Sequence, residues 1–420
     1  MSEDFLHYIW KFGLYDKEAL FTDSGERVTI ISPGVRNSDS GPDFMNARIR
    51  IDDSIFAGNV EIHIKSSDWL SHKHHKDESY SNIILHVVKE YDFKIADTKG
   101  QTIPTVVLTY PAVIELKYNE LNYSDSEILC KRYIADVDKF KLKHWLLRMA
   151  AERLESKISG IDLKQSGPEF AFYLTLFKSF GFKTNSLPFE MLCKTLPLRI
   201  LKSLESVSQY EALLLGQAGM LDDSDSTDDY AVMLTGEYRH LSIKYELKNI
   251  NKSLWKFARM RPVNFPSIRI AQLASLLHEN PGLLTTVLNA RDINEYFRIF
   301  DITASEYWNN RYMIGKLSES RSKKRLGKSG VESVLINSII PYMFAYGKLT
   351  GEEKYTNKAL DILEKLPPED NSPVREWFDA GVCAGNASES QALIHLKSEY
   401  CRKKKCLQCA VGKFVLSDDK

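Results

Sequence analysis

The chain has 420 residues, and its formal net charge is zero because 56 Lys and Arg residues balance 56 Asp and Glu residues. This length allows two or three domains with a sizeable core, and the balanced charge excludes a bulk attraction to polyanions, so a nucleic-acid surface would need a local basic patch. The sequence has no run of 18 apolar residues, and its start, MSEDFLHYIW, lacks the basic and apolar regions of a secretory signal. We therefore expect no membrane span and predict a cytoplasmic protein.

The N-terminal part, residues 1–125, mixes the patterns of helices and strands. We expect a helix at EDFLHYIWKFGLY, where apolar residues recur at helical spacing, and strands at ERVTIISPG, FMNARIRID and SIFAGNVEIHIKS. The polar stretch SDWLSHKHHKDESY predicts a short helix, and the apolar run NIILHVVKEY predicts a strand buried on both faces, with another strand at TIPTVVLTY. These elements predict an α/β domain.

From about residue 126 the sequence changes to a series of amphipathic or buried helices, such as KFKLKHWLLRMAAERLESKI and EEKYTNKALDILEKL. The acidic stretch LDDSDSTDDY interrupts the series and predicts an exposed loop. We therefore predict a mainly α-helical domain over residues 126–380 and a C-terminal cysteine-rich segment over residues 381–420.

Four ionisable residues on two neighbouring predicted strands form the first candidate site. Asp43 opens one strand, and Glu61, His63 and Lys65 alternate with apolar residues along the next, so these three share one face. Carboxylates bind hard cations that polarise a phosphodiester and activate water, and a nearby Lys stabilises developing negative charge. We therefore expect Asp43 and Glu61 to bind Mg²⁺ or Mn²⁺, with Lys65 or His63 assisting the attacking water. The alternative is a solvated polar face without chemistry.

This arrangement resembles the PD-(D/E)XK nuclease superfamily. Pro42-Asp43 stands in place of the PD motif and Glu61-Ile62-His63 in place of (D/E)XK, and the predicted order of helix, three strands, helix and strand is that of the αβββαβ, restriction-endonuclease-like core. The resemblance covers roughly the first 125 residues. It implies a metal-dependent nuclease acting on DNA or RNA, with Glu3 or Glu18 as an accessory acid.

The motif departs from the superfamily at one position. His63 occupies the Lys position, and Lys65 lies two residues further along the same face. Either the base has migrated or the site is inactive. In the second case the protein keeps a nuclease-like fold as a non-catalytic nucleic-acid-binding or scaffold protein.

A group of histidines offers a second metal chemistry. Five of the ten histidines lie between His63 and His86, and His72 and His75 would share one face of a helix. Together with His86 or Asp68 they would hold Zn²⁺ or another transition metal, as in a His/Asp metallohydrolase. The alternatives are a solvated loop whose histidines titrate and a hydrogen-bonded core position for His86.

The C-terminal cysteines form a third candidate site. YCRKKKCLQCAVG places Cys401, Cys406 and Cys409 at the spacing C-x4-C-x2-C, and a C-x2-C loop directs two thiolates at one ion. With Cys383 as the fourth ligand the set fits Zn²⁺ or an iron–sulfur cluster, whereas His395 would favour Zn²⁺. The three lysines between Cys401 and Cys406 are expected to lower the thiol pKa values. The alternative is a set of reduced, buried cysteines.

A basic and aromatic stretch, WKFARMRPVNFPSIR, supplies the candidate nucleic-acid-binding residues Lys256, Arg259, Arg261 and Arg269. Such side chains suit phosphate contacts and base stacking. The alternative is a set of solvated helix faces, with one or two arginines paired to acids inside the helical bundle.

Several stretches along the chain are similar to an uncharacterised bacterial family, a domain of unknown function. They include NSDSGPDFMNARIRI, GNVEIHIKSSDWLSHKHHKD, EALLLGQAGML, MRPVNFPSIRIAQLA and YCRKKKCLQCAVG, so the resemblance spans nearly the full chain. It implies a bacterial protein and adds no activity. The function expected from the residues is therefore a metal-dependent nuclease or nuclease-like nucleic-acid-processing protein, with the binding protein and the metallohydrolase as alternatives and the oligomeric state open.

Overall fold

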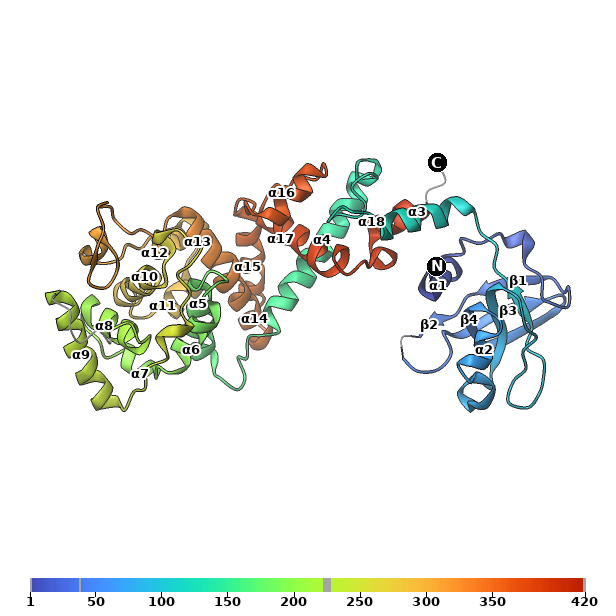
Figure 1. The fold of residues 1–420 in the computed structure, drawn as a ribbon, viewed down its shortest axis with the longest axis horizontal. Helices are drawn as coiled ribbons and strands as arrows, with labels where there is room; N and C mark the ends of the chain where they lie inside the picture. The colour runs from blue at the N-terminus through green and yellow to red at the C-terminus, as the bar shows by residue number, and fades with distance from the viewer. Residues whose placement is uncertain (1, 38, 222–227, 418–420) are drawn as a thin grey trace. The chain divides into compact units, whose positions relative to one another are not determined.

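The computed structural model describes residues 2–37, 39–221 and 228–417, and the chain divides into two compact units (Figure 1). The first unit comprises Met1–Trp145, Asp379–Val382 and Leu396–Lys420, and the second comprises Leu146–Phe378 and Cys383–His395. Most of the cysteine-rich segment therefore folds with the N-terminal part of the chain. The acidic segment LDDSDSTDDY, expected to be an exposed loop, lies largely outside the described residues.

The first unit is built on a mixed β-sheet. Its helices and strands are α1 (Glu3–Phe12), β1 (Val28–Ser32), β2 (Val35–Arg36), β3 (Phe44–Ile51), β4 (Ser54–Lys65), α2 (Asp68–Ser71), β5 (Ile83–Glu90), β6 (Thr105–Val107), α3 (Ala112–Asn122), the start of α4 (Lys139–Ile158), and α18 (Ala410–Ser417). Among the described residues the sheet has six strands in the order β1-β3-β4-β5-β6, with β2 paired to β3. β3 pairs antiparallel with both β1 and β4, whereas β4, β5 and β6 run parallel.

Strand β4 positions the first candidate site because its side chains alternate between the two faces of the sheet. Val60 and Ile62 lie on one face, and Glu61 and His63 lie on the other, and all four side chains are buried. The hairpin that joins β3 to β4 turns at Asp52, whose φ of 47° is tolerated by Asp because its short side chain bonds locally. The alternation predicted from the sequence therefore places two ionisable groups inside the unit.

The connection from β4 to β5 contains the short helix expected from the sequence. Parallel neighbours require a crossover, and here it contains only the four-residue α2 and two 3₁₀ helices, His74–Lys76 and Glu78–Tyr80. Trp69 anchors the crossover, because it packs in a small core with Tyr80, Ile95 and Ile103. An α/β unit followed by a mainly helical region is confirmed at this coarse level, while the order of elements includes the additional two-residue β2.

The second unit is helical (Figure 1). Its elements are the rest of α4, α5 (Pro168–Phe180), α6 (Ser186–Lys194), α7 (Leu198–Leu201), α8 (Val207–Gln217), α9 (Asp229–Tyr245), α10 (Pro266–Glu279), α11 (Leu283–Asn289), α12 (Ile293–Phe300), β7 (Arg311–Met313), β8 (Lys316–Leu317), α13 (Lys328–Val334), α14 (Ile340–Thr350), α15 (Glu353–Lys365), most of α16 (Ser372–Asp379), and α17 (Ala387–His395). A π-helix, Leu335–Ile339, joins α13 to α14. Along the described helices, none combines the length and the apolar character needed to cross a bilayer.

Candidate metal centre

The ionisable residues of β3 and β4 converge inside the first unit. Asp43 directly precedes β3, while Glu61 and His63 project from one face of β4. His86 on β5 lies opposite Glu61 in the parallel register of the two strands. Pairing of the three neighbouring strands β3, β4 and β5 therefore brings together the side chains of Asp43, Glu61, His63 and His86.

The two carboxylates are held by each other's strands. The backbone N–H of Asp43 donates to Glu61 Oε2 at 3.0 Å, and the backbone N–H of Ile62 donates to Asp43 Oδ2, also at 3.0 Å. His7 on α1 adds a third contact, because its Nε2 lies 2.9 Å from Asp43 Oδ2. These contacts fix both acids and direct the second oxygen of Glu61 toward the histidines.

Histidine side chains gather around the other carboxylate oxygen of Glu61, Oε1. One ligand atom from each of His63, His72 and His74 lies within 4.8 Å of the other two. His63 Nε2 lies 3.1 Å from His72 Nδ1, and Glu61 Oε1 lies 3.7 Å from His63 Nε2 and 3.3 Å from His74 Nε2. Ligand atoms around a tetrahedral ion with bonds of ~2.0–2.1 Å stand about 3.3 Å apart. The three histidines therefore have ligand atoms close enough to share one ion, and Glu61 Oε1 lies beside two of them.

His86 supports this set from behind. Its side chain is fully buried, and its Nε2 lies 2.8 Å from His63 Nδ1. If His63 uses Nε2 toward an ion, its proton is on Nδ1 and is donated to His86. A hydrogen bond of this kind fixes the tautomer and orientation of a ligating imidazole. His86 is thus a hydrogen-bonded core histidine, which was one of the two roles considered for it.

Burial sets the protonation states of the histidines. Burial and, to a smaller extent, the neighbouring imidazoles lower the pKa of His63 to about 2, of His74 to about 4 and of His86 to about 3. At neutral pH the three rings are therefore neutral, which is the form that ligates metals.

Glu61 responds to burial in the opposite direction. Burial and then the nearby charge of Asp43 raise the pKa of Glu61 well above its usual range, while the N–H donated by Asp43 opposes the shift. Desolvation penalises the charged carboxylate, and a cation among the three rings would reverse that penalty. The residues present therefore fit a divalent cation both in spacing and in electrostatics.

The site opens to solvent at one edge. Glu61 is 5% exposed and His63 is 2% exposed, whereas the His72 residue is exposed and the Asp43 side chain is 22% exposed. A ligand or water can therefore approach from the side of His72 and Asp43 without unfolding the strands.

Some predicted residues lie elsewhere. The ion pair of Lys65 is made with Glu90 and not with Asp43 or Glu61. Lys65 Nζ lies 3.5 Å from the Glu90 carboxylate, and the two residues are also paired in the β4–β5 register. The carboxylate of Asp68 accepts the backbone N–H of Lys65 at 2.9 Å. Helical spacing predicted that His75 would lie beside His72. The structure places His74 there instead, and His75 is not part of the three-histidine set.

The exchange of His75 for His74 has a local cause. α2 ends at Ser71, and Lys73 adopts a left-handed φ of 65°, so residues 72–75 do not continue one helix. The backbone reversal, which sequence spacing does not reveal, brings His72 and His74 to the same side. His7 was also missed, although a lone histidine among the buried apolar residues of α1 was the available signal.

The accessory acids suggested by the nuclease resemblance differ in their surroundings. Glu3 is partly buried and interacts electrostatically with His72 and Asp43, and its burial raises its pKa. Glu18 instead forms an exposed ion pair with Arg27 at 2.7 Å. Glu3 is therefore the acid near the histidine cluster.

The predicted nucleic-acid-binding residues divide into two groups. Lys256, Arg259 and Arg261 are exposed, as expected for a contact surface. Arg269 is only 6% exposed; its guanidinium donates to Asn264 and lies 4.1 Å from the ring centre of Phe182. Arg269 is therefore not on a surface that could contact a phosphate backbone, and its role is to hold the helical core together.

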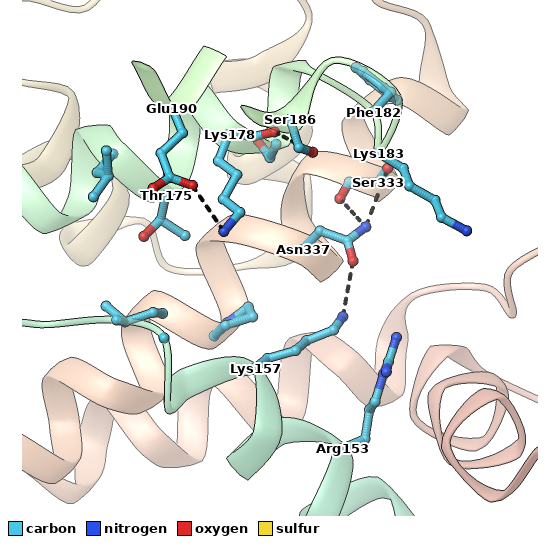
Figure 2. A pocket seen from close by; sticks show the side chains of 15 residues that line it. Arg153, Lys157, Thr175, Lys178, Phe182, Lys183, Ser186, Glu190, Ser333 and Asn337 are labelled. Carbon is cyan, nitrogen blue, oxygen red and sulfur yellow. Dashed lines mark hydrogen bonds and ion pairs between the residues drawn. The ribbon is translucent and has the colours of Figure 1, made fainter. Parts of the chain in front are cut away.

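The second unit has a cleft of about 550 Å³ lined by basic and polar side chains (Figure 2). Four basic residues, Arg153, Lys157, Lys178 and Lys183, line it together with one acid, Glu190. Figure 2 shows Lys178 extended toward Glu190, whose Oε2 lies 3.2 Å from its Nζ. The excess of positive charge suits an anionic ligand.

Backbone irregularities shape this cleft. Phe182 and Lys183 adopt left-handed φ angles of 44° and 68°, a conformation that costs about 1–2 kcal/mol per residue. The π-helix Leu335–Ile339 presents the Ile336 carbonyl and the Asn337 side chain, which accept hydrogen bonds from Lys157 at 3.1 and 3.0 Å. Burial and the charge of Arg153 lower the pKa of Lys157 to about 7. Strained backbone and π-helical turns occur frequently at functional sites.

The C-terminal cysteines are only partly placed as expected. Cys401, Cys406 and Cys409 are buried and belong to the first unit, whereas Cys383 is exposed and belongs to the second, as does His395. Burial, rather than the neighbouring lysines, dominates the thiols: it raises the pKa of Cys401 and of Cys406 to about 12. The cysteine that accompanies the three in the first unit is Cys130, which the sequence did not single out.

Comparison with known proteins gives a family without an assigned activity. Residues 3–372 match the model of a family described as a protein of unknown function, DUF2851. No curated protein and no solved structure matches the chain. Because the match covers most of its length, the chain belongs to the DUF2851 family.

Proposed function

We propose that the first unit is a metal-dependent phosphodiester hydrolase, a nuclease or nuclease-like nucleic-acid-processing enzyme, with the ion bound by His63, His72, His74 and Glu61. The observation that carries the proposal is the spacing of these donors, 3.1 to 3.7 Å between the measured atoms, with imidazoles kept neutral by burial. The choice of phosphodiesters as substrate rests on the likeness of Pro42-Asp43 and Glu61-Ile62-His63 to the PD-(D/E)XK motif.

The donor set changes the metal proposed from the sequence. Mg²⁺ requires oxygen ligands in near-octahedral geometry, and Mn²⁺ also prefers carboxylate oxygens, whereas imidazoles suit Zn²⁺ and related transition metals. Glu61 supplies one oxygen, while Asp43 Oδ2 already accepts from Ile62 and contacts His7. We therefore place Zn²⁺ first, with Mn²⁺ or Mg²⁺ between Asp43 and Glu61 as the second arrangement.

The residues around the donors have separate roles in this proposal. When bound, the ion would polarise the scissile phosphate and lower the pKa of a water molecule. Asp43, partly exposed and beside His7, is positioned to accept the proton of the attacking water. Glu3 adds negative charge near His72 and Asp43. Lys65 pairs with Glu90, so this proposal assigns it no role at the ion.

The test combines metal binding with hydrolysis. Zn²⁺ and Mn²⁺ are titrated calorimetrically into metal-free full-length protein, the His74→Ala variant and a matched His75→Ala control. We expect His74→Ala to lose Zn²⁺ binding and His75→Ala to keep it. Cleavage of bis(4-nitrophenyl) phosphate and of labelled single-stranded DNA and RNA is then measured with the wild type and Asp43→Asn, which should retain the ion and lose turnover. Equal Zn²⁺ binding by the His74→Ala variant and the wild type would refute the proposed site.

A second candidate function is nucleic-acid binding without turnover, favoured by the cleft of the second unit. Arg153, Lys157, Lys178 and Lys183 gather in one cavity against a single acid, and such groups neutralise phosphates. Wild type that binds metal and oligonucleotides but cleaves no phosphodiester would support this candidate. Binding of a labelled oligonucleotide by the double variant Lys178→Glu, Lys183→Glu tests the surface, with the double variant Lys354→Glu, Lys365→Glu, at exposed positions outside the cleft, as the charge-matched control. Unchanged affinity in the double variant would exclude the cleft.

A further inference from the structure

The cleft of the second unit has more positive charge than its own acid can balance. Glu190 is shared by two lysines, because its Oε2 lies 3.2 Å from Lys178 Nζ and its Oε1 lies 2.6 Å from Lys194 Nζ. Among the described residues no acid forms an ion pair with Lys157 or Lys183. Two cationic side chains of the lining are therefore available to a bound anion.

Lys157 is held by neutral groups that orient its ammonium. Arg153 and Lys157 are four residues apart on α4, so they share one face of the helix. Lys157 Nζ donates to the Ile336 carbonyl at 3.1 Å and to Asn337 Oδ1 at 3.0 Å, and Figure 2 shows it extended toward Asn337. Neither acceptor carries a charge. A bound anion would therefore supply the negative charge that this ammonium lacks, and would offset the burial that lowers the pKa of Lys157 to about 7.

The hydroxyl groups of the lining contribute less than its charges. The side-chain hydroxyls of Thr175, Ser179 and Ser186 donate to backbone carbonyl oxygens at 2.8, 2.7 and 3.1 Å. Ser333 differs, because its Oγ accepts from Asn337 Nδ2 at 3.4 Å and keeps its O–H for another acceptor. Recognition in the cleft therefore depends mainly on charge, which disfavours a neutral, sugar-like ligand.

The cleft is larger than a phosphate group alone requires. Its volume of about 550 Å³ lies within the range of about 300–1,000 Å³ that is usual for sites of small organic ligands. Ile161, Leu174, Phe182 and Pro341 add apolar surface to the lining. The Phe182 ring is fixed from one side by the Arg269 guanidinium, 4.1 Å from the ring centre. The cleft therefore has room for an anionic group with an organic part attached.

We infer that the cleft binds a terminal phosphate group, a phosphomonoester, through Lys157, Lys183 and Arg153, with its organic part against the apolar residues. A phosphomonoester carries about −1.5 to −2 charges at pH 7 and has three acceptor oxygens, which matches two lysines without acidic partners. Each phosphodiester of a strand carries a single charge. The ligand is either a phosphorylated small molecule or the phosphorylated end of a nucleic-acid strand.

This inference does not rest on the hydrolase proposed for the first unit, because every residue of the cleft belongs to the second unit. It narrows the second candidate function from binding along a strand to binding of a terminal phosphate. It also stands if no strand binds and the ligand is a small molecule.

The first experiment compares probes with and without the phosphate. Adenosine 5′-monophosphate, ribose 5-phosphate and inorganic phosphate are titrated calorimetrically into the full-length protein, with adenosine and ribose as the matched uncharged probes. We expect adenosine 5′-monophosphate to bind at least about tenfold more tightly than adenosine, because charge-assisted hydrogen bonds are lost with the phosphate. A chelator is present throughout, so the result is independent of metal binding and hydrolysis at the histidine site.

Variants then assign the binding to the cleft. Lys157→Gln removes the charge and keeps an N–H donor, and Lys183→Asn removes the charge at a left-handed position that Asn tolerates. Each should weaken binding of adenosine 5′-monophosphate by about tenfold or more. The control Lys354→Gln, Lys365→Gln changes two exposed lysines outside the cleft and should bind as the wild type does. Thermal unfolding checks each variant, and Lys183→Asn, at an exposed position, tests the cleft if Lys157→Gln does not fold.

A final comparison identifies the source of the phosphate. Fluorescence anisotropy at constant ionic strength measures binding of decathymidylate with a phosphate at the 5′ end, at the 3′ end or at neither. A phosphorylated strand that binds more tightly than adenosine 5′-monophosphate identifies a strand end, the reverse order identifies a small molecule, and equal affinities show recognition of the phosphate wherever it is attached. The inference would be overturned if no phosphorylated probe bound more tightly than its unphosphorylated counterpart and inorganic phosphate did not bind. Wild-type affinity in folded Lys157→Gln and Lys183→Asn would also overturn it.

Discussion

The histidine site of the first unit and the cleft of the second unit handle charge in opposite ways. In the first, burial keeps the imidazoles neutral, so their nitrogen lone pairs can ligate a cation. Burial also raises the pKa of Glu61, whose carboxyl group would become charged when a cation binds. In the second, four basic side chains and one acid line a cavity, so the group suits an anion, while burial lowers the pKa of Lys157 to about 7 and removes part of that charge at neutral pH. Desolvation therefore favours the neutral form of the buried groups in both sites, and a bound ligand of opposite charge would favour the charged form in each.

The comparison also shows how each site is shaped. The left-handed Lys73 brings ligand atoms of His72 and His74 within 4.8 Å of each other, and the left-handed pair Phe182 and Lys183 forms part of the cleft wall. In both cases an irregular backbone places side chains that a regular helix would point apart. The predictions below test whether the two regions behave as a cation site and an anion site.

The largest effect is expected from removing His63, whose two ring nitrogens contact His72 and His86. His63→Ala should weaken Zn²⁺ binding by more than about 100-fold, because losing a ligand costs more than losing a residue behind it. Competition with a chromophoric chelator measures the change, and His75→Ala is the control. Equal Zn²⁺ affinity of the His63→Ala variant and the His75→Ala control would show that His63 does not ligate Zn²⁺.

A smaller loss of metal affinity is expected from His86, which supports His63 without facing the ion. His86→Ala should weaken Zn²⁺ binding by about 10- to 100-fold, because the ligating ring loses the partner that fixes its tautomer. Chelator competition measures the affinity, and thermal unfolding of the metal-free variant shows whether the sheet remains folded. A folded variant with wild-type affinity would contradict the supporting role.

Arg269 tests whether a buried basic residue of the second unit stabilises the fold rather than binding a ligand. Its guanidinium stacks on Phe182 and donates to Asn264 and Gln272, so Arg269→Lys should lower the free energy of unfolding by about 1–3 kcal/mol. Urea denaturation followed by circular dichroism measures the change. Zn²⁺ affinity of the first unit should stay unchanged. A variant as stable as the wild type would show that the buried contacts of Arg269 contribute little.

The smallest effect is a pH dependence of anion binding in the cleft. The Lys157 ammonium is present below about pH 7 and lost above it, so affinity for single-stranded oligothymidylate should fall by up to about tenfold per pH unit above 7. The phosphodiesters do not titrate in this range. Groups with which Lys157 interacts are Arg153, Glu369, Asn337 and Ile336, and the same cleft includes Lys178, Lys183 and Glu190.

Lys157→Arg provides the control for that pH profile, because Arg stays charged throughout the range. Fluorescence anisotropy at constant ionic strength should give a flatter profile for the variant than for the wild type. Identical profiles in both proteins would assign the pH dependence to another group and weaken the contrast between the two sites.

Several features followed from local sequence rules. The alternation of Val60, Glu61, Ile62 and His63 placed two ionisable groups on one face of a strand, and the change from strand-like to helical patterns marked the coarse architecture. The spacing of the terminal cysteines indicated a shared loop. Each of these depends on periodicity or short spacing, which the chain carries within a few residues.

The remaining features needed the folded chain. His7 and His74 reached the histidine site through a helix packed on the sheet and a left-handed turn at Lys73. The sequence by itself determined which side chains share a strand face or a short loop, because backbone geometry fixes those relations locally. Tertiary structure alone decided which distant groups meet and which are buried, because packing sets their separation from one another and from water.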